Sequence, residues 1–195
     1  MIIPLPHGDF RAYLFDCDGT VADSMPVHHR AWSRAVGEWG GEFPEDLFYA
    51  WGGRPVADIV ADLNGRQGLA MPVAEVARRR EELYRELLPE VTLLPGILPH
   101  IEEAHRHRRS AVVSGSTRDS VLASLTALGV AESFETLVCA EDVTRPKPDP
   151  EGFLLAARRL GVEPRHCLVF EDSPLGLAAA AAAGMAAVDV LAPRG

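Results

Sequence analysis

Short apolar segments alternate with helix-like segments over the second half of the chain, and this alternation limits the possible folds more than any other feature. The apolar segments with strand character are residues 111–113, 137–139, 168–170 and 186–190. The helical patterns before and between them cover residues 97–108, 119–128, 150–160 and 174–183. Strands that alternate with helices predict a parallel sheet with helices on both of its faces.

An earlier apolar segment, residues 12–15, has the character of another strand of this sheet, but the interval after it breaks the alternation. Between residues 27 and 88 the sequence contains no convincing strand, and helical patterns cover residues 27–39, 45–51, 56–64 and 73–88. An all-helical block between two strands of one sheet indicates an inserted domain. We therefore expect an α/β core formed by residues 1–24 and 94–195 and a helical cap formed by residues 25–93.

Composition excludes several classes of protein. The 195 residues are 47% hydrophobic and 24% charged, as in ordinary globular proteins, and the net charge of −9 disfavours binding to nucleic acid. The apolar runs are much shorter than the roughly 20 residues that a membrane-spanning helix needs. Three widely spaced cysteines predict neither a disulfide framework nor a zinc cluster. We expect a cytoplasmic protein with no membrane or nucleic-acid partner.

Two acidic residues follow the first predicted strand directly. Asp16 and Asp18 stand one residue apart after residues 12–15, and Gly19 can then turn the chain away. In open α/β sheets, ligands bind at the carboxyl ends of the strands. The strand therefore carries two carboxylates to the edge of the sheet where a ligand is expected.

Polar groups also follow three later strands. In chain order they are Ser114-Gly115-Ser116, Lys147, and the pair Glu171 and Asp172. Because the strands are expected to be parallel, these loops emerge at the same edge as Asp16 and Asp18. The sequence thus predicts a cluster of acids with one lysine and two hydroxyl groups.

This set of groups suits phosphoryl transfer. An aspartate can attack phosphorus and form an aspartyl-phosphate, which divides one difficult step into two easier ones. Carboxylates are ligands that Mg²⁺ prefers, and Lys147 would add fixed positive charge. Ser114 and the backbone N–H groups near Gly115 could bind phosphoryl oxygens, while Asp18 is placed to protonate the leaving oxygen.

The same segments carry a family resemblance that extends over nearly the whole chain. Residues 15–24, the lysine within residues 145–148, and the triplet Glu171-Asp172-Ser173 resemble the haloacid dehalogenase-like phosphatases and phosphomutases. The helical insertion resembles the small cap of the β-phosphoglucomutase-like branch. The short chain is closest in appearance to small sugar-phosphate phosphatases of the fructose-1-phosphate phosphatase type. The resemblance implies a Rossmann-like parallel-sheet core with an inserted all-helical cap domain.

The resemblance also implies residue roles in the core. Asp16 would be the nucleophile and a Mg²⁺ ligand, and Asp18 would be the general acid/base that also offers its backbone carbonyl to Mg²⁺. Asp172, together with Glu171, would complete the metal site. The phosphoryl-binding groups would be Lys147 and the segment Ser114-Gly115-Ser116.

Further residues match positions that contact the rest of the substrate in relatives. In the cap these are His28, Trp32, Gly53 and Arg54, and in the core Arg118. Closure of the cap would exclude water and bring His28 and Arg54 onto the substrate. The Lys-Asn pair common in β-phosphoglucomutases is missing near Arg80, where only the positive charge is kept.

These features predict a Mg²⁺-dependent phosphatase that acts on a small phosphorylated metabolite, expected to be a sugar phosphate, through an aspartyl-phosphate on Asp16. The nearest alternative is β-phosphoglucomutase, an isomerase that would pass the phosphoryl group back to a sugar. A dehalogenase and a non-catalytic binding module remain as weaker alternatives, because a fold alone does not determine function. The expected partner is the small substrate alone, with the chain a monomer or a weak dimer.

Overall fold

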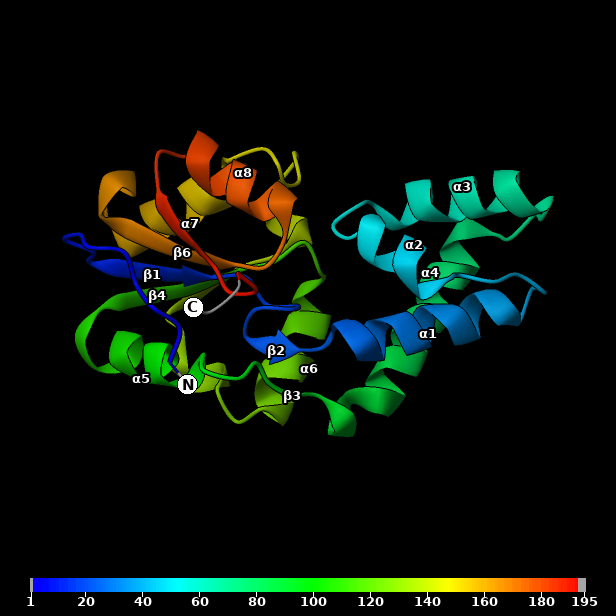
Figure 1. The fold of residues 1–195 in the computed structure, drawn as a ribbon, viewed down its shortest axis with the longest axis horizontal. Coiled ribbons are helices and arrows are strands. Elements are labelled where there is room, and N and C mark those ends of the chain that lie inside the picture. Colours follow the sequence, from blue (N-terminus) through cyan, green and yellow to red (C-terminus); the bar gives the residue numbers. More distant parts are fainter. Residues whose placement is uncertain (1, 193–195) are drawn as a thin grey trace. The chain divides into compact units, whose positions relative to one another are not determined.

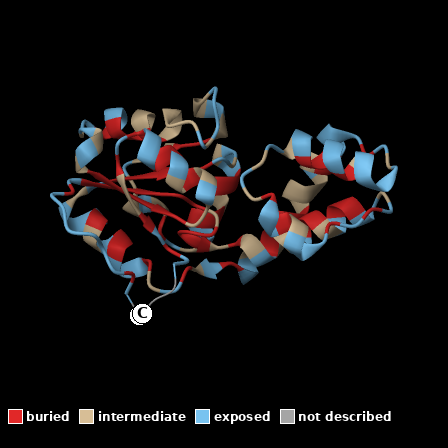
Figure 2. Cartoon of the chain, turned by 45° about the horizontal axis from the view of Figure 1, so that its top comes forward, coloured by how far each residue is buried: buried red, intermediate tan, exposed pale blue. Residues whose placement is uncertain are grey.

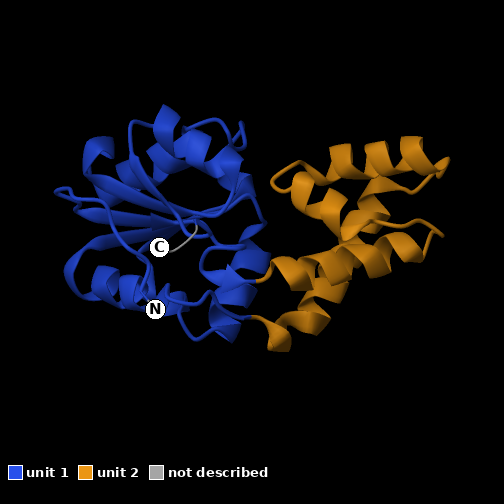
Figure 3. Cartoon of the chain, in the orientation of Figure 1, with its two compact units in different colours: residues 1–23, 92–195 blue, residues 24–91 orange. Residues whose placement is uncertain are grey.

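The computed structural model describes residues 2–192 (Figure 1). The chain divides into two compact units, Met1–Asp23 with Thr92–Gly195 as unit 1 and Ser24–Val91 as unit 2 (Figure 3). The last three residues of the predicted core, 193–195, lie outside the described part. Within that part, no helix has the length and apolar character needed to cross a membrane.

A parallel sheet forms the centre of unit 1. Its strand order is β5-β4-β1-β6-β7, and every pairing between neighbours in this sheet is parallel. The strands are β1 (Ala12–Phe15), β4 (Arg109–Val113), β5 (Thr136–Val138), β6 (Cys167–Glu171) and β7 (Ala186–Asp189). The predicted fold class, a parallel-sheet α/β core with a helical insertion, is confirmed.

Helices cover both faces of the sheet, as Figure 2 shows by the buried strands between them. Alternate residues of β1 belong to two hydrophobic clusters on opposite faces of the sheet. Tyr13 and Phe15 pack on one face, and Ala12 and Leu14 pack on the other. The first face is covered by α5 (Leu98–His107) and α6 (Arg118–Ala127), the second by α7 (Glu151–Leu160) and α8 (Pro174–Ala182). Both faces are therefore closed to water, which explains why β1 is apolar throughout.

Smaller elements complete unit 1. Short 3₁₀ turns occupy η2 (Ala131–Ser133), η3 (Ala140–Asp142) and η4 (Pro164–His166). A two-stranded antiparallel ribbon joins β2 (Ala22–Asp23) to β3 (Thr92–Leu93), at the residues where the chain leaves and re-enters the unit. The sequence did not predict this ribbon, because two-residue strands are too short to show a periodic pattern.

Unit 2 is helical. It contains α1 (Met25–Gly37), α2 (Glu45–Ala50), α3 (Val56–Gln67), α4 (Val73–Leu87) and the 3₁₀ turn η1 (Leu88–Glu90). Its core gathers aromatic and aliphatic side chains that include Trp32, Phe43 and Leu63. Helix α3 continues three residues beyond the expected end at residue 64, because it passes through Gly65 and ends at Gln67, capped by Gly68, whose φ of 66° suits a helix C-terminus.

Candidate active site

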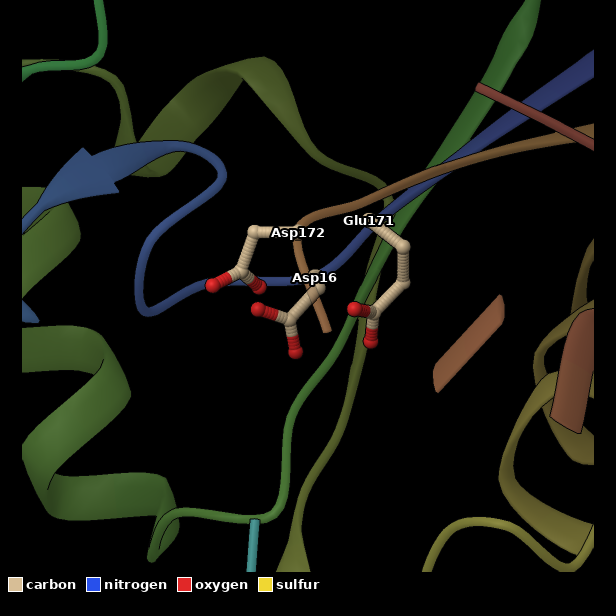
Figure 4. A group of neighbouring side chains, drawn as sticks. All are labelled: Asp16, Glu171 and Asp172. Atoms are coloured by element: carbon tan, nitrogen blue, oxygen red, sulfur yellow. The ribbon is translucent and has the colours of Figure 1, made fainter. Parts of the chain in front are cut away.

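Three carboxylates meet at the carboxyl end of the sheet (Figure 4). Phe15 pairs with Phe170 in the parallel register, so Asp16, one residue beyond β1, lies beside Glu171 at the end of β6. Asp172 follows at once, and one oxygen of each of the three side chains lies within 4.8 Å of the others. Asp16 and Glu171 are buried and Asp172 is half-buried.

Lys147 neutralises part of this charge. Its Nζ donates to Asp16 Oδ1 at 2.6 Å, to Glu171 Oε1 at 2.5 Å and to the carbonyl oxygen of Val113 at 3.1 Å. Burial alone would lower the pKa of Lys147, but attraction to the two carboxylates outweighs it and raises the pKa. Lys147 is therefore a fixed cation that bridges the ends of β1 and β6.

The lysine does not balance the whole cluster. Burial raises the pKa of Asp16 well above its usual range, against the opposing attraction of Lys147. Burial, followed by repulsion from Glu171, raises the pKa of Asp172 to about 7. Three carboxylates face one ammonium group, and their oxygen atoms are the donors that hard divalent cations take. The residues present therefore fit a Mg²⁺ ion.

Glu171 is held by the start of helix α8. Its Oε2 accepts from the backbone N–H of Ser173 at 2.8 Å and from the Ser173 hydroxyl at 2.9 Å, while Ser173 Oγ accepts from Gly176 N–H at 3.0 Å. A Cβ atom on Gly176 would lie 1.8 Å from Glu171 Oε1, so only glycine leaves room for the carboxylate. No role was predicted for Ser173 or Gly176, although a serine before a helix is a typical N-cap signal.

The turn after β1 adds a further contact that no sequence pattern predicted. Gly19 adopts a φ of 87°, and its N–H donates to the carbonyl of Ala22 at 2.8 Å. The buried Thr20 then lies with its Oγ1 3.4 Å from Asp172 Oδ1, which accepts its hydrogen bond. The turn therefore connects the loop that carries Asp16 to the third acid, Asp172.

Asp18 is not one of the three clustered acids, although its charge is among the causes that raise the pKa of Asp172. Its Oδ2 accepts a hydrogen bond from Ser116 Oγ at 2.8 Å, across 98 residues of sequence. Ser116 N–H in turn donates to Ser114 Oγ at 3.0 Å, and a Cβ on Gly115 would meet open space. The structure thus joins the segment Ser114-Gly115-Ser116 to the loop that carries Asp16 and Asp18.

The segments that form this site also lie within a match to a known protein family. A model of the haloacid dehalogenase-like hydrolases matches residues 10–184. The chain belongs to this family. The resemblance expected from the residues around Asp16, Lys147 and Glu171 is thereby confirmed.

Named relatives of this haloacid dehalogenase-like hydrolase include phosphatases. It is 37% identical to fructose-1-phosphate phosphatase YqaB of Escherichia coli (strain K12), over 93% of this chain and 96% of that protein. It is 34% identical to the validoxylamine A 7'-phosphate phosphatase of Streptomyces hygroscopicus subsp. limoneus, over 90% and 83%. The crystal structure of CbbY from Rhodobacter sphaeroides in complex with phosphate superimposes with a TM-score of 0.82 at 29% identity, covering 91% and 84% of the two chains.

The hydrolase carries four of its predicted substrate-binding residues in unit 2. His28 is buried and stacks on Tyr84, with ring centroids 3.9 Å apart and planes 9° from parallel. Trp32 is buried beneath the guanidinium of Arg80, which lies 5.7 Å from its ring centroid. Arg54 follows Gly53, lies over the ring of Trp51 and donates from Nη2 to Asp62 Oδ2 at 2.7 Å.

Arg118, the remaining predicted contact, begins helix α6 in unit 1. Its Nη2 donates to Asp142 Oδ2 at 2.5 Å, and its backbone N–H donates to the carboxylate of Glu141. A second arginine, Arg159, donates to the other oxygen of Asp142 at 2.7 Å. A role for Arg118 in substrate binding would therefore require its guanidinium to leave Asp142.

Proposed function

We propose that this hydrolase is a Mg²⁺-dependent phosphatase of a small phosphorylated metabolite, namely a sugar phosphate, and that it works through an aspartyl-phosphate on Asp16. The predicted enzyme class, a phosphoric monoester hydrolase, is confirmed by family membership and by the phosphatases among the relatives. The observation that carries the mechanism is the placement of Lys147 Nζ between Asp16 and Glu171, with Asp172 beside them. The 37% identity to a fructose-1-phosphate phosphatase favours a sugar phosphate as substrate.

In the first step, a carboxylate oxygen of Asp16 forms a bond to phosphorus while the ester P–O bond breaks. The departing alkoxide takes a proton from Asp18, which begins this step as the carboxylic acid. In the second step, water attacks the phosphorus of the aspartyl-phosphate and gives its proton back to Asp18, so that Asp16 and inorganic phosphate are released. Both aspartates return to their starting forms.

The positive charge near phosphorus comes from two sources. Lys147 is the chain's own contribution, because its ammonium group is fixed against Asp16 and faces a dianionic phosphate. Asp16, Glu171 and Asp172, with the backbone carbonyl of Asp18, would hold Mg²⁺, which screens the repulsion between carboxylate and phosphate. Ser114 and the N–H groups around Gly115 are proposed to bind the phosphoryl oxygens.

The remainder of the substrate is assigned to the cap. We infer that His28, Trp32, Gly53 and Arg54 contact the sugar, and that Arg118 joins them once it exchanges Asp142 for the substrate. Specificity would then depend on side chains that do not take part in the phosphoryl chemistry.

A substrate panel tests the proposal directly. Purified protein is incubated with phosphorylated sugars, fructose 1-phosphate among them, with Mg²⁺ and with a chelator, and released phosphate is measured. We expect Mg²⁺-dependent release from sugar phosphates by the wild type and none by Asp16→Asn. β-Glucose 1-phosphate with a trace of bisphosphate is included, because formation of glucose 6-phosphate in place of free phosphate would identify a mutase and contradict the proposal.

A further inference from the structure

We propose that Ser116 is a positioning residue for the general acid/base Asp18, and that Ser114 alone of the two serines binds the phosphoryl group with its side chain. This inference rests on the proposed function, because it gives a role to a residue that acts through Asp18. The sequence predicts substrate binding by both serines, and nothing in their spacing distinguishes their roles. The hydrogen bonds of their hydroxyl groups distinguish the two serines.

The hydroxyl of Ser116 is committed to Asp18. A serine hydroxyl has a single proton to donate, and that of Ser116 goes to Asp18 Oδ2 at 2.8 Å. It has no second proton for a phosphoryl oxygen. Ser114 Oγ has the opposite arrangement, because it accepts from Ser116 N–H at 3.0 Å and keeps its own proton to donate. The two serines therefore have complementary capacities.

The backbone holds both ends of the Ser116–Asp18 contact. On one side, the carbonyl of Ser116 accepts from Ala140 N–H at 3.0 Å, and Ser114 N–H donates to the carbonyl of Val138 at 2.9 Å. On the other side, Asp18 forms an isolated bridge to Ala22, next to the tight turn at Gly19. A hydrogen bond between two anchored loops fixes the direction of the Asp18 carboxylate.

Ser116 donates to Asp18, whereas other residues donate to the three clustered acids. Asp16 is held by Lys147, Glu171 by Lys147 and Ser173, and Asp172 by Thr20. Asp18 is held by Ser116 and is not one of the three clustered acids. The Ser116 contact thus keeps the acid/base carboxylate distinct from the carboxylates proposed for the metal.

If Ser116 acts through Asp18, the loss of kcat/KM in Ser116→Ala depends on the leaving group of the ester. An alkoxide needs a proton as it departs, whereas p-nitrophenolate is stable without one, so only the alkyl ester needs a well-placed Asp18 in the step that phosphorylates Asp16. The ratio kcat/KM reports the barrier to that step. For a sugar or alkyl phosphate we expect Ser116→Ala to lower kcat/KM by about 10- to 100-fold, the effect of one hydrogen bond to a group that becomes charged as Asp18 gives up its proton. For p-nitrophenyl phosphate the loss is expected to be under about 3-fold.

Ser114→Ala is the matched control from the same loop. It should lower kcat/KM for both esters by a similar factor and weaken competitive inhibition by inorganic phosphate, whereas Ser116→Ala should leave the inhibition constant for phosphate within about 2-fold. Ser116→Thr keeps the hydroxyl and is expected to restore most of the activity on the alkyl ester. In an Asp18→Asn background, Ser116→Ala should cause no further loss.

Three results would each overturn the inference and make Ser116 a phosphoryl ligand. They are equal losses of kcat/KM on both esters in Ser116→Ala, weaker inhibition of that variant by phosphate, and an undiminished effect of Ser116→Ala in the Asp18→Asn background. The thermal midpoint of every variant is measured, and a Ser116→Ala protein that does not fold would contradict a role confined to Asp18. In all these cases the wild type still hydrolyses phosphate esters, so the proposed function stands. Wild-type protein that releases no phosphate with Mg²⁺ would instead refute the proposed function, and this inference with it.

Discussion

Replacing Gly176 by alanine tests the packing that holds Glu171, and it reverses the sign normally expected of such a change. Alanine in a helix interior is favoured over glycine by about 1 kcal/mol. At this position in α8, however, the new Cβ would lie 1.8 Å from Glu171 Oε1 and 1.9 Å from Cδ, where real contacts stay beyond 3.0 Å. The carboxylate must therefore move by about 1 Å or more, or the helix must shift.

That movement disturbs every contact which the structure gives the Glu171 carboxylate. Lys147 at 2.5 Å and both donors of Ser173, at 2.8 and 2.9 Å, would lose their geometry around a side chain that is fully buried. Breaking a buried ion pair costs about 3–5 kcal/mol. After the helix gain is subtracted, we expect Gly176→Ala to lower the free energy of unfolding by about 2–4 kcal/mol. Phosphatase activity should fall sharply, because Lys147 loses one of the two carboxylates that hold it.

Urea denaturation of the metal-free protein measures the effect, and two variants control it. Gly65→Ala in α3 makes the same change where a Cβ meets nothing within 4 Å, so it should stabilise unit 2 by about 0.4–1 kcal/mol. In a Glu171→Ala background the obstacle is gone, and Gly176→Ala should then be neutral or stabilising. If Gly176→Ala stabilises the otherwise native protein as Gly65→Ala does, the account of how Glu171 is seated is refuted.

Three further predictions follow from the charges of the site. Because the folded-state pKa of Asp172 is raised to about 7, the metal-free protein should lose stability as the pH rises from about 4 to 7. Mg²⁺ should stabilise the protein increasingly over the same pH range. In Asp172→Asn, the thermal midpoint of unfolding should depend less steeply on pH. Lys147→Met should abolish activity and lower the unfolding free energy at neutral pH by about 3–5 kcal/mol, since two buried carboxylates lose their cation. Arg145→Met, at a side chain that is 69% exposed, should change the unfolding free energy by under about 1 kcal/mol. Equal losses of stability in the two variants would contradict the role given to Lys147. Thr20→Val should raise the Mg²⁺ concentration needed for half-maximal activity several-fold by freeing Asp172, with an unchanged Mg²⁺ dependence as the contrary result.

The parts of the fold that follow local patterns were predictable from the sequence. Buried parallel strands are apolar over most of their length, so β1 and β6 stood out, and the acids at their carboxyl ends had to lie at the edge of the sheet. The helical insertion was equally visible, because its helices carry apolar residues at helical spacing.

What escaped prediction depends on contacts between distant residues. The hydrogen bond from Ser116 to Asp18 spans 98 positions, and no local pattern marks it. The need for glycine at position 176 arises only when α8 is packed against Glu171. Likewise, the pairing of Arg118 with Asp142 depends on how α6 meets the end of β5, which the residue type at position 118 cannot reveal.

The central claim is a covalent bond between phosphorus and Asp16, and its most direct test is to trap that bond. Wild-type protein is mixed with Mg²⁺ and a radiolabelled sugar phosphate, quenched in acid within milliseconds, and digested for mass spectrometry. We predict up to one label per chain, on the peptide that contains Asp16, released by hydroxylamine as expected of an acyl phosphate and missing from Asp16→Asn. Steady release of phosphate without any labelled Asp16 peptide, or at an undiminished rate in Asp16→Asn, would contradict the mechanism.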